Sequence, residues 1–139
     1  MTSSATNTEQ LRARLRQNGP VWLAHCSLGE RSDIEIEVTG SGAGPSIAHV
    51  EYAAECVAGL AQLLPDLEAA LNAVEESHPL FPPRRSRRWY LEGLSFTAPD
   101  SRRGEALFTL DEPGYDYLYV LYSVEIVAGR AGQAHADTR

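Results

Sequence analysis

The sequence predicts an α+β fold in which one long helix packs on one face of a single antiparallel sheet of about five strands. Apolar residues recur at three- and four-residue spacing over residues 46–77, which is typical of an amphipathic helix. Apolar and polar residues alternate in short runs before and after that helix, as they do in strands. The connections between these runs are short, which favours antiparallel pairing in the order α-β-β-α-β-β-β.

The length and composition fit one globular domain. The chain has 139 residues, of which 43% are hydrophobic and 22% charged, as is usual for a domain with a single core. We assign residues 1–7 to a flexible N-terminus, residues 8–128 to the domain and residues 129–139 to a flexible C-terminal tail. No apolar run approaches the roughly 20 residues that cross a bilayer, and the N-terminus lacks the apolar core of a signal peptide. A cytoplasmic protein is therefore expected.

The N-terminal third predicts a short helix followed by a hairpin. The helix covers residues 8–17 and is apolar only at Leu11 and Leu15, so it needs another element to pack against. Two strands follow over residues 21–28 and 33–40, joined by a loop of about five residues. The second strand alternates isoleucine or valine with glutamate, so one of its faces is expected to be buried and the other exposed.

The long helix over residues 46–77 is expected to be kinked. Ser46 is a suitable N-cap residue, and Pro65 lies inside the apolar pattern. Proline removes one helical hydrogen bond, and its ring crowds the carbonyl four residues earlier. We therefore expect a kink at Pro65, or two abutting helices joined there.

Three strand patterns, over residues 88–97, 105–111 and 117–127, complete the predicted sheet. The apolar residues of the first pattern change phase part-way along, and a bulge at Gly93 reconciles its two halves.

The last strand predicts an aromatic surface. Its helix-facing row is Leu118, Val120, Tyr122, Val124 and Ile126, which leaves Tyr115, Tyr117, Tyr119 and Leu121 on the opposite face, with Trp22 or Trp89 extending it from adjacent strands. Exposed aromatic side chains in a row are typical of protein interfaces. Two alternatives are that the N-terminal helix covers the tyrosines through its two leucines, and that the row lines a ligand groove.

The charged residues exclude several chemistries. All 12 basic residues are arginine, so the chain has no P-loop lysine, Schiff-base lysine or lysine general base. The absence of lysine, together with the abundant alanine, indicates a GC-rich bacterial genome. The net charge of −7 disfavours binding to nucleic acid or anionic membranes and favours a basic partner.

The glycine-rich stretch after the second strand superficially resembles a phosphate-binding loop. Its glycines are Gly40, Gly42 and Gly44, which do not have the G-x-G-x-x-G spacing of a dinucleotide site. Pro45 also removes a backbone N–H near the place where phosphate would need one. We therefore predict a plain connection into the helix, and no cofactor.

Cysteine and histidine residues offer a second candidate site. Cys26 and Cys56 are expected to be buried thiols rather than a disulfide. His25 could meet His49 or Cys56 across the fold in a metal or thiol site, although no metal-ligand spacing supports one, and no metal is predicted.

Acidic and basic side chains offer two more. Glu35 and Glu37 share one face of their strand about 7 Å apart, a separation suited to acid/base chemistry. Arg84, Arg85, Arg87 and Arg88 precede two aromatic residues, so the stretch from Arg84 to Tyr90 could hold phosphates and stack a base. The same arginines could instead pair with carboxylates.

The sequence favours a non-enzymatic protein-binding module over an enzyme. The first hypothesis is an acidic protein of the bacterial inhibitor or immunity type, which binds a basic partner or a second copy of itself through the aromatic face and the helix carboxylates. The second is a small enzyme or ligand-binding protein that uses His25, His49 and the strand carboxylates. The third is a local single-stranded nucleic-acid binder that uses Arg84 to Tyr90.

Overall fold

The computed structural model describes residues 4–77, 89–110 and 120–138, which form one mixed sheet and three helices. The helices are α1 (Ser4–Arg14), α2 (Ile47–Ala58) and α3 (Leu60–Ser77). The strands are β1 (Arg16–Asn18), β2 (Val21–Leu28), β3 (Arg31–Ser41), β4 (Gly44–Pro45), β5 (Trp89–Phe96), β6 (Arg103–Leu110), β7 (Val120–Val127) and β8 (Arg130–Thr138). Within these ranges no helix is long and apolar enough to cross a membrane.

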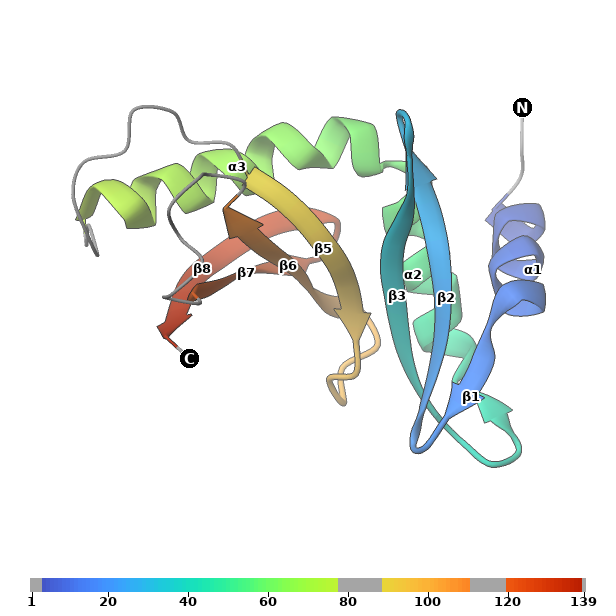
Figure 1. The fold of residues 1–139 in the computed structure, drawn as a ribbon. Coiled ribbons are helices and arrows are strands. Elements are labelled where there is room, and N and C mark those ends of the chain that lie inside the picture. The colour runs from blue at the N-terminus through green and yellow to red at the C-terminus, as the bar shows by residue number, and fades with distance from the viewer. Residues whose placement is uncertain (1–3, 78–88, 111–119, 139) are drawn as a thin grey trace.

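The strands follow the order β1-β2-β3-β5-β6-β7-β8, with β4 paired to β3 off this path. Every neighbouring pair is antiparallel except β3 and β5, which run parallel. Parallel strands need a long crossover connection, and here α2 and α3 lie in the segment between them. Figure 1 shows α2 beside the β2–β3 hairpin and α3 running over strands β5–β8, so the helix pair spans both halves of the sheet.

The predicted fold class was therefore wrong in its architecture. In place of about five antiparallel strands, the described residues form an 8-stranded mixed sheet. Short connections argued for antiparallel pairing, but the connection between β3 and β5 contains two helices. The coarser assignment to the α+β class is confirmed.

The long helix is divided, but not at the proline. The chain leaves helical geometry at Gly59, whose N–H donates to the carbonyl of Glu55 at 3.1 Å. The carbonyl of Gly59 then accepts hydrogen bonds from the amides of Gln62 and Leu63, which starts α3. Pro65 lies inside α3 without ending it. Glycine has the lowest helix propensity after proline because its backbone loses the most entropy, which explains why the break falls there.

Three strands had not been predicted, namely β1, the two-residue β4 and β8. The short helix ends at Arg14, earlier than expected, and β1 follows it directly. Residues 130–138, which the sequence pattern assigned to a flexible tail, pair with β7 as β8. The side chains of β8 that pair with buried residues of β7 are alanines, including Ala131 and Ala134. Alanine contributes little to an apolar period, so the sequence pattern did not predict this strand.

The β2–β3 hairpin is confirmed, with a shorter turn than expected. Only Gly29 and Glu30 separate the two strands, and Gly29 has the positive φ of 63° that such tight turns require. The predicted alternation also holds, since Ile34, Ile36 and Val38 are fully buried.

Two further details of the strands are confirmed. The β5–β6 register shifts between Leu91 and Gly93, which is the predicted bulge. Tyr122, Val124 and Ile126 are fully buried, so the described part of the last strand has the predicted phase.

All three helices cover the same face of the sheet. The buried leucines of α1 and α3 belong to one core together with the buried residues of the strands. On the α3 side, the indole N–H of Trp89 donates to Asn72 Oδ1 at 2.8 Å, while its ring meets that of Tyr122 at 4.9 Å. The opposite face of the sheet has no described helix on it.

The glycine-rich stretch forms a tight β3–β4 turn, in which Gly40 is closely packed. A Cβ on Gly40 would lie 2.5 Å from the carbonyl oxygen of Gly44, 2.7 Å from Cα of Pro45 and 2.8 Å from Cδ1 of Trp22. The amide of Ser46, which a phosphate cradle would leave available, donates to the carbonyl of Thr39 at 2.9 Å. Gly40 is therefore needed for close backbone approach in this turn.

This packing gives a matched pair of substitutions. Gly40→Ala should lower the free energy of unfolding by about 1–3 kcal/mol, because the added methyl group overpacks the turn. Gly42→Ala should leave it within about 0.5 kcal/mol of the parent, since the nearest atom to a new Cβ there is Gln17 Nε2 at 4.0 Å. Urea denaturation of both variants measures the difference. Equal stability of the two variants would contradict this role for Gly40.

Candidate functional site

The structure separates the two histidines of the predicted enzyme site. His25 is exposed on β2, opposite Glu35 and on the face without helices. His49 lies on α2, on the covered side of the sheet, and is buried. Its Nε2 lies 2.7 Å from the carbonyl oxygen of Ala98, and its Nδ1 lies 2.7 Å from Ser46 Oγ. Because a carbonyl only accepts, Nε2 carries the proton and Nδ1 accepts from the serine. His49 therefore joins α2 to the β5–β6 connection and does not meet His25.

The thiols are buried and unpaired, as predicted. Burial raises the pKa of Cys26, and it raises the pKa of Cys56 from 9.0 to about 11. The thiolate is the reactive form of cysteine, so both residues are poor nucleophiles at neutral pH.

The uncovered side of the sheet, called the open face below, is acidic. Its side chains alternate with the buried ones along each strand, which places the following residues on it: His25, Asp33, Glu35, Glu37, Glu92, Ser95, Glu105, Leu107, Leu121, Ser123, Glu125 and His135. The carboxylates come from β3, β5, β6 and β7, so they extend across the centre of the sheet. Sequence alternation identified Glu35 and Glu37, but the strand order was needed to bring the others beside them.

A shallow hollow of about 230 Å³ lies on this face where β3 meets β5. Gly93 is part of its lining. No side chain fits at this position, because a Cβ there would lie 2.6 Å from the carbonyl oxygen of Glu35. The predicted acid/base pair, Glu35 and Glu37, lines the hollow together with His25 and Glu92. Glu37 accepts a hydrogen bond from Ser95 Oγ at 3.2 Å. The hollow thus presents carboxylates around a floor that lacks a side chain.

An arginine, an aromatic ring and a carboxylate form an ordered group at one border of the open face. The guanidinium of Arg31 lies 3.8 Å from the ring centre of Tyr90, and its Nε lies 3.0 Å from Asp33 Oδ1. The hydroxyl of Tyr90 donates to Asp33 Oδ2 at 2.9 Å. These two hydrogen bonds, from Tyr90 and then Arg31, lower the pKa of Asp33, so this carboxylate stays ionised. The group shows that the face already holds a guanidinium between a ring and a carboxylate.

The predicted aromatic surface is placed only in part. Tyr115, Tyr117 and Tyr119, like Arg84, Arg85, Arg87 and Arg88, lie outside the described residues. Leu121 is on the open face as expected, one position from buried Tyr122. Trp22 and Trp89 instead pack against the core on the covered side, so they do not extend the open face. Leu11 and Leu15 also belong to the core, and α1 therefore does not cover the open face.

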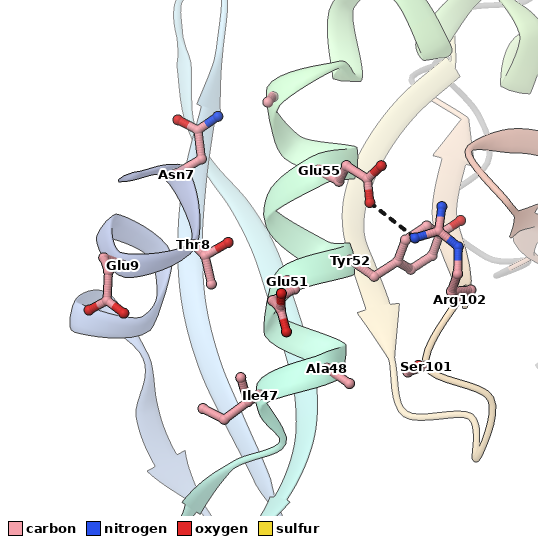
Figure 2. A pocket seen from close by; sticks show the side chains of 11 residues that line it. Asn7, Thr8, Glu9, Ile47, Ala48, Glu51, Tyr52, Glu55, Ser101 and Arg102 are labelled. Carbon is pink, nitrogen blue, oxygen red and sulfur yellow. Dashed lines mark hydrogen bonds and ion pairs between the residues drawn. The ribbon is translucent and has the colours of Figure 1, made fainter. Parts of the chain in front are cut away.

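A second concave surface lies on the covered side of the sheet. This groove, of about 740 Å³, is lined by residues of α1 and α2 and by Ser101 and Arg102, which lie on the other side of α2 from α1 (Figure 2). Figure 2 shows Glu55 directed toward Arg102, and Arg102 beside the ring of Tyr52. Arg102 Nη1 lies 3.3 Å from Glu55 Oε2. Ile47 is 46% exposed at the start of α2, on the wall of the groove. Two more carboxylates, Glu9 and Glu51, line it.

Neither surface has the side chains of a metal centre. Among the described residues, no group of three or more histidine, cysteine or acidic side chains is close enough to hold a metal ion. Comparisons with protein-family models, with curated proteins and with solved structures found no match.

The raised pKa values of Tyr52 and Cys56 predict that the protein becomes less stable at alkaline pH. Burial raises the pKa of Tyr52 from 10.0 to about 12, and that of Cys56 to about 11. A group whose pKa is raised by folding stabilises the native state fully below its unfolded pKa, and this contribution is lost as the pH rises through the native pKa. The free energy of unfolding should therefore fall as the pH rises from about 9 to about 12.

Tyr52→Phe separates the two contributions. The tyrosine hydroxyl accepts from the N–H of Gly129 at 2.9 Å and donates to the carbonyl of Ile126 at 3.4 Å, so its loss should cost about 1 kcal/mol at pH 7. Above pH 10 the variant should lose stability less steeply than the parent, because it no longer has a phenol to ionise. Urea denaturation at pH 7 to 11 measures both effects. Identical pH profiles for the variant and the parent would contradict the role of Tyr52.

Proposed function

We propose that this chain is a non-enzymatic protein-binding module that receives a basic partner on the open face. The observation that carries the proposal is the excess of carboxylates there. Asp33 pairs with Arg31, and Glu125 pairs with Arg103 at 2.8 Å. Among the described residues, no ion pair neutralises the remaining carboxylates of the face, which are Glu35, Glu37, Glu92 and Glu105.

This charge distribution suits association with a cationic protein. A face lined by one sign of charge attracts the opposite sign and accelerates encounter, and it repels partners of like charge. The net charge of −7 acts in the same direction. A partner that supplies arginine or lysine side chains would pair with carboxylates that have no ion pair with another described residue.

Apolar side chains on the same face support a protein partner rather than a small cation. Leu107 and Leu121 are half-buried on neighbouring strands, and Leu107 also lines the hollow. Interfaces combine a less charged centre with a polar rim. The row of Tyr115, Tyr117 and Tyr119, which precedes Leu121 in the sequence, stays a predicted continuation of this surface. An inhibitor of the immunity type would use such a face to neutralise a basic protein. The unpaired thiols are typical of a reducing compartment such as the cytoplasm.

Charge-neutral substitutions test the face with a short arginine-rich peptide as the probe. The variant Glu35→Gln, Glu37→Gln, Glu92→Gln should weaken peptide binding about tenfold at low salt, because each exposed ion pair contributes about 0.2–1 kcal/mol. The control variant Glu9→Gln, Glu51→Gln, Asp66→Asn changes the net charge equally, but its exposed side chains lie on the helices. It should weaken binding by less than about threefold.

Isothermal titration calorimetry at several salt concentrations provides the measurement. Binding by the parent should weaken as salt rises, and the open-face variant should show a shallower salt dependence. An equal loss of affinity in the two variants would show that only the net charge of the chain matters, and it would contradict the proposed site. Absence of peptide binding at low salt would overturn the proposal outright.

A further inference from the structure

Ser46 and His49 form a hydrogen-bonded pair at the start of α2. Ser46 is the N-cap residue of this helix, and a serine in this position ordinarily accepts a hydrogen bond from an amide of the first turn. The Ser46 side chain makes no such capping bond. Its hydroxyl instead lies 2.7 Å from Nδ1 of His49, to which it donates a hydrogen bond. The serine is therefore directed toward a base rather than toward the backbone.

His49 is held in the tautomer that a general base requires. Its Nε2 donates to the carbonyl oxygen of Ala98 at 2.7 Å, so Nδ1 carries no proton and can receive one. The imidazole is 8% exposed, and its two hydrogen bonds fix the ring between α2 and the β5–β6 connection. A nucleophile within hydrogen-bond reach of a base, which is itself oriented by a third group, is the arrangement that activates serine for covalent chemistry.

The surroundings of Ser46 suit the attack on a carbonyl group. The first amides of a helix point toward its N-cap residue and have no partner within the helix. Those of Ile47 and Ala48 can therefore stabilise the negative charge that forms on an attacked carbonyl oxygen. Ser46 is half-buried, while Ile47 is 46% exposed and lines the groove together with Ala48 (Figure 2). The hydroxyl is thus next to exposed apolar side chains that a short acyl chain can contact.

We propose that Ser46 is a nucleophilic serine that accepts the acyl group of an activated ester, such as an aryl ester with a short apolar acyl chain. Ser46 Oγ attacks the carbonyl carbon, and its proton passes to Nδ1 of His49. The bond to the leaving oxygen then breaks, and His49 returns the proton to that oxygen. The products are an ester on Ser46 and a free phenol. This modification of the chain is separate from the partner binding proposed for the open face.

A fluorophosphonate with a short alkyl chain gives the first test, because its tetrahedral phosphorus resembles the acylation intermediate and its serine adduct is stable. Intact-protein mass spectrometry should show one adduct per chain, and peptide mapping should place it on Ser46. Ser46→Ala should abolish this adduct. Ser41→Ala is the matched control and should leave labelling unchanged. The Ser41 hydroxyl is exposed in the same segment and accepts from the amide of Ala43 at 3.2 Å, and no described histidine is hydrogen-bonded to it.

His49→Gln tests the base, and p-nitrophenyl acetate tests the reaction with an ester. Loss of the general base should slow fluorophosphonate labelling about a hundredfold, and circular dichroism establishes that the variant is folded. The parent should release p-nitrophenolate at least about tenfold faster than Ser46→Ala does. A further measurement needs no folded variant. The parent in concentrated urea should not be labelled on Ser46, because the serine and the histidine are held together only in the folded chain.

Absence of a fluorophosphonate adduct on Ser46 in the folded parent would overturn the proposal. So would equal labelling of the native and the urea-unfolded chain, or a folded His49→Gln variant that is labelled as fast as the parent. An adduct that remains in Ser46→Ala, or equal release of p-nitrophenolate by this variant and the parent, would show that another residue is the nucleophile and would also overturn it.

Discussion

The parallel pairing of β3 with β5 is the contact on which the rest of the structure depends. It joins the N-terminal hairpin to the C-terminal strands, and it requires Gly93, because a Cβ there would lie 2.6 Å from the carbonyl oxygen of Glu35. The crossover between these strands carries α2 and α3, so both helices must lie over the sheet that they connect. A single core results, with its helices on one side.

The same pairing creates the acidic surface. Covering one face of a sheet leaves the alternate side chains of every strand in solvent. Parallel register sets Glu37 beside Ser95 and Glu35 beside Gly93, while β6 brings Glu105 opposite Ser95. Carboxylates that are distant in the sequence thus meet around a position that has no side chain. The open face and its hollow follow from the topology rather than from any local motif.

Local patterns were sufficient for the elements in which one face is strongly apolar. The alternation in β3, the bulge at Gly93 and the phase of Tyr122, Val124 and Ile126 could be predicted because each depends on side-chain direction within one strand. Weak patterns failed. The alanines of β8 give little contrast between apolar and polar positions, so this strand was not predicted. The break in the long helix was expected at Pro65, but the backbone leaves helical geometry at Gly59.

By itself the sequence determined the α+β class, the buried thiols, the absence of lysine and the acidity of the chain, because these depend on composition and on short-range periodicity. Only the tertiary structure decided the strand order, the placement of His25 and His49 on opposite sides of the sheet, and the packing of Trp22 and Trp89 against the core. These features depend on which segments meet across long sequence separations. Periodicity fixes the direction of a side chain relative to its own strand, but it contains no information on the neighbouring strand.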